Sequence, residues 1–369
     1  MDIFITILIF VLVLGLLIFV HELGHFLAAK KAGVRVEEFG FGYPPRLFSI
    51  KKGETRYSIN LLPLGGFVKL TGEDGKKRND PRSFAAKRGR KRGFILIAGV
   101  LGNLIFAFLI FAVISQLGTP TIVGDDIEPS NLVKDPGIQV VSVVPDTPAA
   151  QSGFELGDVI TQIETDSIST TTDVQEALEN KNGKPVDFTV SRGDEQRNIT
   201  ATPRTEYDPA EGALGLGYAR VALVKAPWYM APYEGMVLTL NATGQIIRAL
   251  GEIIISLFPG AENKVDVVGF VGIAVVTGQM TELGWSFFLQ FVALLSINLM
   301  IINILPLPAL DGGRLLFVFI ETLRGKKISP RVESIVHASG FILLLILFVA
   351  ITISDVFRFD VLDRIKNFF

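Results

Sequence analysis

The sequence contains no cysteine and carries almost no net charge. Its 369 residues include 35 lysines and arginines against 37 aspartates and glutamates, which gives a formal net charge of −2. The absence of cysteine excludes a small secreted domain held together by disulfides. The charge balance lacks the basic excess of nucleic-acid-binding proteins, so we expect no nucleic-acid partner. Because hydrophobic residues make up 49% of the chain, the composition also excludes intrinsic disorder.

The charges that are present are unevenly distributed along the chain. Residues 28–93 hold 17 basic and 6 acidic residues, whereas residues 118–283 hold 10 basic and 23 acidic residues. This asymmetry predicts that the two regions lie in different environments. The basic cluster at 87–92 precedes an apolar run, which is typical of a topology anchor at anionic lipid headgroups; nucleic-acid binding is the alternative.

Long uncharged runs predict a polytopic α-helical membrane protein with about four transmembrane helices. Residues 3–20 alone would span about 27 Å as a helix, close to the thickness of a bilayer core. The apolar stretches 250–259 and 265–276 are short and contain glycine or proline, so they are interpreted as interfacial or re-entrant. The predicted segments are a first span (1–29), a basic loop (30–93), a second span (94–117), an inserted domain (118–205), a linker with an interfacial helix (206–283), a third span (284–313), a loop (314–338), a fourth span (339–357) and a tail (358–369).

The basic loops predict the orientation of these spans. By the positive-inside rule, residues 30–93 and 314–338 face the cytoplasm. Both termini and the acidic inserted domain then lie on the outer side of the membrane.

Two of the three histidines belong to the motif His21-Glu22-Leu23-Gly24-His25. Residues four apart share a helix face, so His21 and His25 can bind one metal ion, and Glu22 can take a proton from the attacking water. A chance match on a polar helix is the alternative, but this motif lies inside an apolar run, where charged groups are costly and functional by default. Glu22 lies about 12 Å along the helix from Lys30, which predicts a site near the cytoplasmic side.

A third metal ligand is expected far away in the sequence. Asp311 follows the third apolar run in a polar, proline-containing stretch, where freed backbone must line protein or a cavity. The alternative for Asp311 is an ordinary Asp-Gly turn. Asn298 and Asn303 can donate hydrogen bonds to a substrate carbonyl or a developing oxyanion, or they can join helices to one another. His337 is interpreted as a packing residue and not as a ligand.

These motifs together resemble the site-2 proteases, which are intramembrane zinc metalloproteases, and within them the bacterial subgroup that cleaves anti-sigma factors. The resemblance rests on the HELGH motif in a first span, a PDZ-like insert and the segment from Asn298 to Gly313. It implies one zinc ion held by His21, His25 and Asp311, with Glu22 as the general base and with Asn298 and Asn303 in contact with substrate. The chain departs from the family pattern at Gly99-Val100 and Gly269-Phe270, where a Gly-Pro pair is usual.

The resemblance also implies a membrane-associated β-hairpin region after the first span. Its strands are expected to pair with an unwound substrate. The residues assigned to this pairing are Tyr57, Ser58, Ile59, Asn60, Gly65 and Gly66.

The inserted domain alternates short strands and turns, with strands expected at 137–144, 158–164, 186–191 and 196–201. A helix is expected at 172–180, beginning with a capping box between Thr172 and Gln175. The segment resembles one circularly permuted PDZ domain of α+β fold, placed between the second and third spans. That resemblance implies a carboxylate-binding loop at Pro136, Gly137 and Ile138, which would bind a peptide C-terminus. A steric filter that binds no peptide is the alternative.

The expected function is zinc-dependent hydrolysis of peptide bonds within transmembrane helices of membrane protein substrates, as in regulated intramembrane proteolysis. Anti-sigma factors or signal-peptide remnants are the expected substrates, and the enzyme is expected to be a monomer in the lipid bilayer. Two other classes are weighed against it. A PDZ-bearing scaffold would not need the complete ligand set, and a metal transporter would not need a peptide-binding insert.

Overall fold

The computed structural model describes residues 3–75, 77–130, 132–193, 195–208, 211–256 and 269–358. The chain divides into two compact units. The first comprises Met1–Ile110, Met236–Gly278 and Phe291–Phe369, and the second comprises Phe111–Gly235 and Gln279–Gln290.

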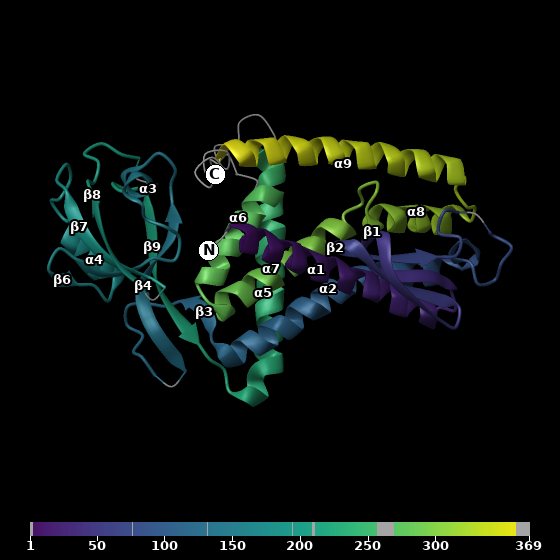
Figure 1. Cartoon of the computed structure of the whole chain (residues 1–369), viewed down its shortest axis with the longest axis horizontal. Helices are drawn as coiled ribbons and strands as arrows, with labels where there is room; N and C mark the ends of the chain where they lie inside the picture. The colour runs from purple at the N-terminus through teal and green to yellow at the C-terminus, as the bar shows by residue number, and fades with distance from the viewer. Residues whose placement is uncertain are drawn as a thin grey trace. The chain divides into compact units, whose positions relative to one another are not determined.

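Within the described residues, four helices are long and apolar enough to cross a membrane, judged by length and composition. They are α1 (Ile3–Lys31), α2 (Gly89–Leu117), α7 (Trp285–Ile304) and α9 (Pro330–Arg358) (Figure 1). The expectation of about four such helices is confirmed in this sense. The largest differences from the expected spans are at three bounds. Helix α2 begins within the basic cluster, α7 ends at Ile304 and not at position 313, and α9 begins nine residues before position 339.

Helices α1 and α2 pack closely because both carry glycine at the contact. A Cβ atom on Gly24 would lie 2.2 Å from the Ala98 carbonyl oxygen, and one on Gly102 would lie 3.0 Å from the Val20 carbonyl oxygen. Residue numbers fall along α1 as they rise along α2, so the two helices run antiparallel. This close approach leaves no room for larger side chains at these positions.

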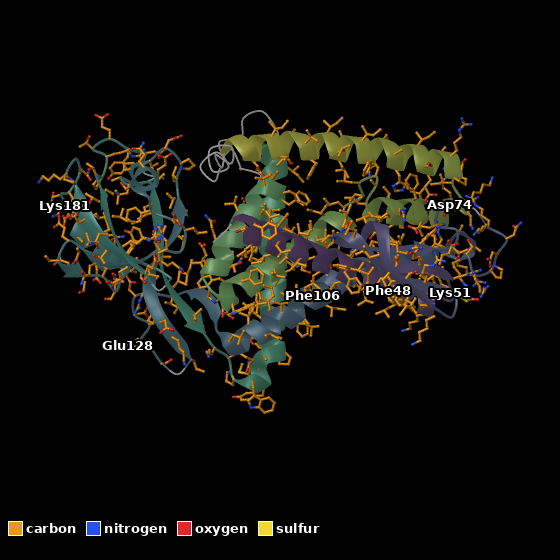
Figure 2. All side chains as sticks on the ribbon, in the orientation of Figure 1. Phe48, Lys51, Asp74, Phe106, Glu128 and Lys181 are labelled. Carbon is orange, nitrogen blue, oxygen red and sulfur yellow. The ribbon has the colours of Figure 1, made fainter. Side chains whose placement is uncertain are left out.

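The loop between α1 and α2 forms a sheet from two long strands, β1 (Val36–Lys52) and β2 (Thr55–Leu70). Both strands fold back, so that four rows of backbone lie side by side. Residues 46–52 pair with 55–60, residues 56–59 pair also with 38–41, and residues 36–41 pair also with 66–70. The last row, 66–70, therefore has one paired side and forms an edge among the described residues. Apolar side chains such as Phe48 are exposed on this sheet (Figure 2).

Three more helices lie in the part of the first unit that the structure describes. These are α5 (Ala231–Ser256) and α6 (Phe270–Glu282), which both continue into the second unit, and α8 (Asp311–Arg324). The expected interfacial stretch 250–259 is described only to residue 256, where it belongs to α5, and part of 265–276 also lies outside the described residues. Helix α8 and the start of α9 occupy most of the region 314–338, which was expected to be a loop. Helix α8 ends at Arg324 and is followed by Gly325, whose φ of 65° is in the left-handed region.

The second unit is built on a seven-stranded sheet of order β3-β9-β4-β5-β7-β8, with β6 paired to β5. Two short helices, α3 and α4, accompany it, and the buried core includes Ile138, Ile160, Val174 and Phe188. The elements are β3 (Thr119–Ile122), β4 (Val133–Val143), α3 (Pro148–Ser152), β5 (Val159–Ile163), β6 (Asp166–Ser167), α4 (Thr171–Leu178), β7 (Val186–Arg192), β8 (Glu195–Ala201) and β9 (Leu216–Val224). Short 3₁₀ helices lie at Phe84–Ala86 and Trp228–Met230.

Two expectations about this unit are corrected. The sheet continues past residue 205, because β9 pairs with both β4 and β3. The capping box of α4 is formed by Thr170 and Asp173, not by Thr172 and Gln175. Three consecutive threonines offer equivalent starting points, and the helix begins at the one whose partner three residues later is a short carboxylate.

Candidate metal centre

Three side chains from distant parts of the sequence meet at one point in the first unit. His21 and His25 lie one turn apart on α1, and Asp311 is the first residue of α8. The Oδ2 atom of Asp311 lies 2.9 Å from the Nε2 atom of each histidine, and the two Nε2 atoms are 3.1 Å apart. The histidines are buried, and the donor atoms converge as those of a metal site do.

The cluster fits zinc in the chemistry and spacing of its donors. Two imidazoles and one carboxylate form a ligand set found in catalytic zinc sites, and ligands at about 2.0–2.2 Å in a tetrahedron lie about 3.3 Å from one another. A glycine, Gly99 of α2, borders the site, and a Cβ atom there would lie 2.3 Å from the His25 Nε2 atom. The space beside the donor atom is therefore kept open by the absence of a side chain.

The second ring nitrogen of His25 is fixed by the neighbouring helix. Its Nδ1 atom lies 2.8 Å from the Ile95 carbonyl oxygen, to which Nδ1–H donates when Nε2 is the metal-binding atom. A hydrogen bond of this kind sets the tautomer and the orientation of a ligand histidine. The Nδ1 atom of His21 is also buried, but it has no such partner among the residues that the structure describes.

The turn before Asp311 is held from two sides. Ala309 has a φ of 75°, and its N–H donates to the Nδ1 atom of His337 on α9 at 2.9 Å. Arg314 on α8 forms an ion pair with Glu73, which follows β2. His337 is not part of the described cluster, and the structure gives it a contact with this turn that sequence reasoning missed. Its partner lies 28 residues away, so no local pattern signals it.

Glu22 lies between the histidines in the sequence and contacts the edge row of the hairpin region. Its Oε2 atom accepts a hydrogen bond from the Val68 N–H at 3.0 Å. Gly65 and Gly66 pack on α1 just before the motif, with their Cβ positions near Ile18 and Phe19. The edge formed by residues 66–70 is therefore beside the general-base candidate.

The other hairpin residues assigned to substrate pairing do not form an edge. Tyr57, Ser58 and Ile59 lie in a row that is paired on both sides, and Asn60 pairs with Arg46 and donates its side-chain N–H to the Gly42 carbonyl. The expectation that Tyr57, Ser58 and Ile59 pair with a substrate strand is corrected, because their backbone groups face a neighbouring row on each side. Strand β1 folds back, so that its residues 38–41 cover the second side of this row. A simple hairpin expected from the local sequence pattern has no such additional row.

Asn298 and Asn303 lie on α7, which ends before the turn that carries Asp311. The Asn303 side chain donates to the Leu299 carbonyl oxygen at 3.0 Å. Neither asparagine hydrogen-bonds to the three clustered side chains among the described contacts.

In the second unit, the segment expected to bind a carboxylate is part of the sheet. Ile138 is fully buried and pairs with both Arg220 of β9 and Ile160 of β5, and Gly137 pairs with Val221. Pro136 has no N–H to donate. The expectation of a ligand loop at these three residues is therefore wrong, because the strand begins earlier than expected.

A cavity of about 390 Å³ lies instead between α4 and the start of β9. Its lining includes Gln175 and Leu178 of α4 together with Gly212, Leu216 and Tyr218. Strand β3 pairs only with residues 221–224 of β9, so residues 216–219 have one open side among the described strands.

Comparisons with known proteins agree with this site. Residues 9–347 match the family described as peptidase family M50. The chain is similar to zinc metalloprotease RasP of Geobacillus kaustophilus, with 32% identity covering 95% of this chain and 97% of the relative. It is also similar to zinc metalloprotease RasP of Oceanobacillus iheyensis (31%; 96% and 99% covered) and to regulator of sigma-W protease RasP of Bacillus subtilis (28%; 96% and 98% covered).

Proposed function

Since this chain belongs to peptidase family M50 and is a zinc metalloprotease of the intramembrane, site-2 type, we propose that His21, His25 and Asp311 hold its zinc. The observation that carries this proposal is the convergence of their three donor atoms from α1 and α8 within 3.1 Å. The glycine at position 99, which leaves space beside the His25 donor atom, supports it.

Glu22 is the general base of the proposed mechanism. When bound, zinc polarises the scissile carbonyl and lowers the pKa of water. The Glu22 carboxylate takes a proton from the attacking water and then delivers it to the leaving amine. Its hydrogen bond with the Val68 N–H holds it beside the edge row. Asn298 and Asn303 donate to the substrate or to the developing negative charge, which requires Asn303 to leave the Leu299 carbonyl.

The substrate is a membrane protein whose transmembrane helix unwinds locally at the site. A helix buries its carbonyls in backbone hydrogen bonds, so cleavage requires an extended segment. We assign the pairing of that segment to the edge row 66–70, which includes Gly66 and Val68 and is preceded by Gly65. A substrate carbonyl that accepts from the Val68 N–H displaces Glu22 from this bond and frees the carboxylate to act on water.

The orientation proposed for the chain follows its charges. Residues 30–93 and 314–338 face the cytoplasm, while both termini and the second unit lie outside a bacterial plasma membrane. Four spans then cross the membrane, and the active site lies towards the cytoplasm. The exposed apolar side chains of the β1–β2 sheet are placed at the lipid surface.

The second unit is proposed to be a single permuted PDZ domain. Its groove lies between α4 and β9, where an open strand side and a cavity are adjacent, and backbone N–H groups of the loop before β9 bind a peptide carboxylate. Fluorescence polarisation on the full chain tests this with peptides of one sequence ending in a free or an amidated C-terminus. Only the free form is expected to bind, and Leu178→Lys is expected to abolish it. Equal or absent binding of both peptides would contradict the groove and favour a steric filter.

One relative carries the name regulator of sigma-W protease. For this chain we propose that anti-sigma factors or signal-peptide remnants are the substrates.

The direct test is cleavage of a purified transmembrane substrate in liposomes. Wild-type protein is expected to cleave it, a chelator is expected to stop cleavage, and Glu22→Gln is expected to lower the rate by about 10²–10⁴-fold while zinc is retained. Glu54→Gln, an exposed position in the same loop region, is the matched control and should cleave normally. Wild-type turnover by Glu22→Gln would contradict the assignment of the general base.

A further inference from the structure

Two buried polar groups without partners occur at the same level of the α1–α2 contact. The Asn103 side chain is fully buried, and neither its Oδ1 nor its Nδ2 atom has a hydrogen-bond partner within the described part of the chain. The same is true of the Nδ1 atom of His21. Buried polar groups are nearly always hydrogen-bonded, so three orphaned atoms in one place need an explanation.

The register of the two helices places Asn103 opposite His21. Gly24 contacts Ala98, and Gly102 contacts Val20. Four residues towards the C-terminus of α2 therefore correspond to four residues towards the N-terminus of α1. His25 lies beside Ile95 and Gly99. Moving one turn back along α1 leads to His21, and moving one turn on along α2 leads from Gly99 to Asn103.

The two histidines therefore have parallel surroundings, with one difference. His25 has the Ile95 carbonyl for its Nδ1–H, whereas His21 has no oxygen at its Nδ1 atom among the described contacts. Metal-binding histidines almost always donate their second ring N–H to an oxygen, which fixes the ring and strengthens the ligand. An asparagine amide supplies such an oxygen and can also donate.

We infer that Asn103 is the positioning residue of His21, with its Oδ1 atom accepting the Nδ1–H of His21 directly or through one buried water. One such water would bond the Nδ1–H of His21 and the Oδ1 atom of Asn103, and two partners lie within the range for buried waters. A role of Asn103 as a simple link between helices predicts a side-chain bond to another helix, yet the described interhelical bond uses its backbone carbonyl, which accepts from the Ser296 hydroxyl at 2.8 Å. This inference rests on the proposed zinc site.

Zinc affinity of the full chain in detergent, measured by competition with a chelator, tests the inference. Asn103→Leu keeps the side-chain size but removes the acceptor, so it is expected to weaken zinc binding by about 10–100-fold. Asn103→Asp keeps an oxygen in place and is expected to bind at wild-type strength or tighter. Ser296→Ala is the matched control, because it removes a buried polar group from the same junction without altering the Asn103 side chain, and it should bind as wild type does.

A cobalt-substituted sample adds a spectroscopic readout that packing alone would not change. The visible cobalt bands are expected to shift in Asn103→Asp relative to wild type, because a carboxylate at Nδ1 strengthens His21 as a ligand. Wild-type zinc affinity in folded Asn103→Leu would overturn the inference. If that variant does not fold, unchanged cobalt bands in Asn103→Asp would overturn it.

A His25→Ala arm separates this inference from the zinc site itself. If His25→Ala loses zinc while Asn103→Leu binds it as wild type does, only the role of Asn103 is wrong. If His25→Ala retains wild-type zinc affinity, the proposed metal centre is wrong and the role of Asn103 falls with it.

Discussion

At the scale of single residues, the site depends on which side chains are present and which are missing. The HELGH motif predicts two ligand candidates and a base from local spacing alone, and Asp311 is predicted from its polar, proline-rich context at membrane depth. The contacts of His25 with Ile95 and of Ala309 with His337 could not be predicted, because they join residues far apart in the chain. The local sequence pattern therefore predicts the ligand and base candidates. The hydrogen bonds that position them depend on tertiary packing.

The clearest prediction at this scale concerns Gly99. In Gly99→Ala, the new methyl group would lie 2.3 Å from the His25 Nε2 atom, so the ring must move away from the metal. Zinc affinity measured by chelator competition is expected to fall by more than about tenfold.

Gly93→Ala in the same helix is the control for this prediction. A Cβ atom there meets its nearest neighbour, in Leu315, at an ordinary 3.5 Å. Replacing glycine by alanine inside a helix stabilises by about 0.5–1 kcal/mol, so this variant should bind zinc normally. Normal zinc binding by Gly99→Ala would show that the metal lies elsewhere.

At the scale of elements, helices were easier to predict than strand pairing. Runs of apolar residues locate α1, α2, α7 and α9, because length and hydropathy are local properties. The β1–β2 region was expected to be a simple hairpin, but residues 38–41 pair on both sides. This pairing depends on contacts between rows that are distant in sequence. Of the residues that the sequence analysis assigns to substrate pairing, only Gly65 and Gly66 therefore lie at or next to the edge row beside Glu22.

The N-terminus of α4 gives a prediction with a defined pH dependence. Hydrogen bonds from Thr170 and Ser169 lower the pKa of Asp173 from 3.8 to about 2. Because the folded pKa lies below the ordinary value, the stabilisation is present above about pH 4 and is lost as the pH falls towards 2. At pH 7, Asp173→Asn is expected to lower the opening free energy of the α4 amides by about 1 kcal/mol in hydrogen exchange on the full chain.

The difference between Asp173→Asn and wild type should disappear near pH 2. Glu176→Gln, at an exposed position of the same helix, serves as the control and should leave exchange unchanged. A difference that persists unchanged at low pH would show that the carboxylate charge does not stabilise this cap.

At the scale of the whole molecule, the sequence predicts two regions of different character, and the chain forms two compact units. The end of the second region was placed too early, since β9 lies beyond residue 205 in sequence but inside the sheet. Strand β9 follows the loop residues 202–208 and 211–215. The local sequence of such a strand does not show that it completes a sheet begun earlier in the chain.

The proposed orientation can be tested cleanly because the chain has no cysteine of its own. Single cysteines at Glu128 and Lys51, both exposed positions, report on the second unit and on the β1–β2 sheet (Figure 2). A membrane-impermeant maleimide is expected to label Glu128→Cys in cells with an intact plasma membrane, and Lys51→Cys only after that membrane is permeabilised. The reverse pattern would invert the proposed topology.

The zinc content of purified protein tests the central claim most directly, because that claim joins two distant segments in one metal site. Wild-type protein is expected to contain about one zinc per chain, and Asp311→Ala, measured in parallel after identical purification, is expected to contain much less. Equal zinc in the two proteins would contradict the account, since it would remove Asp311 from the metal centre.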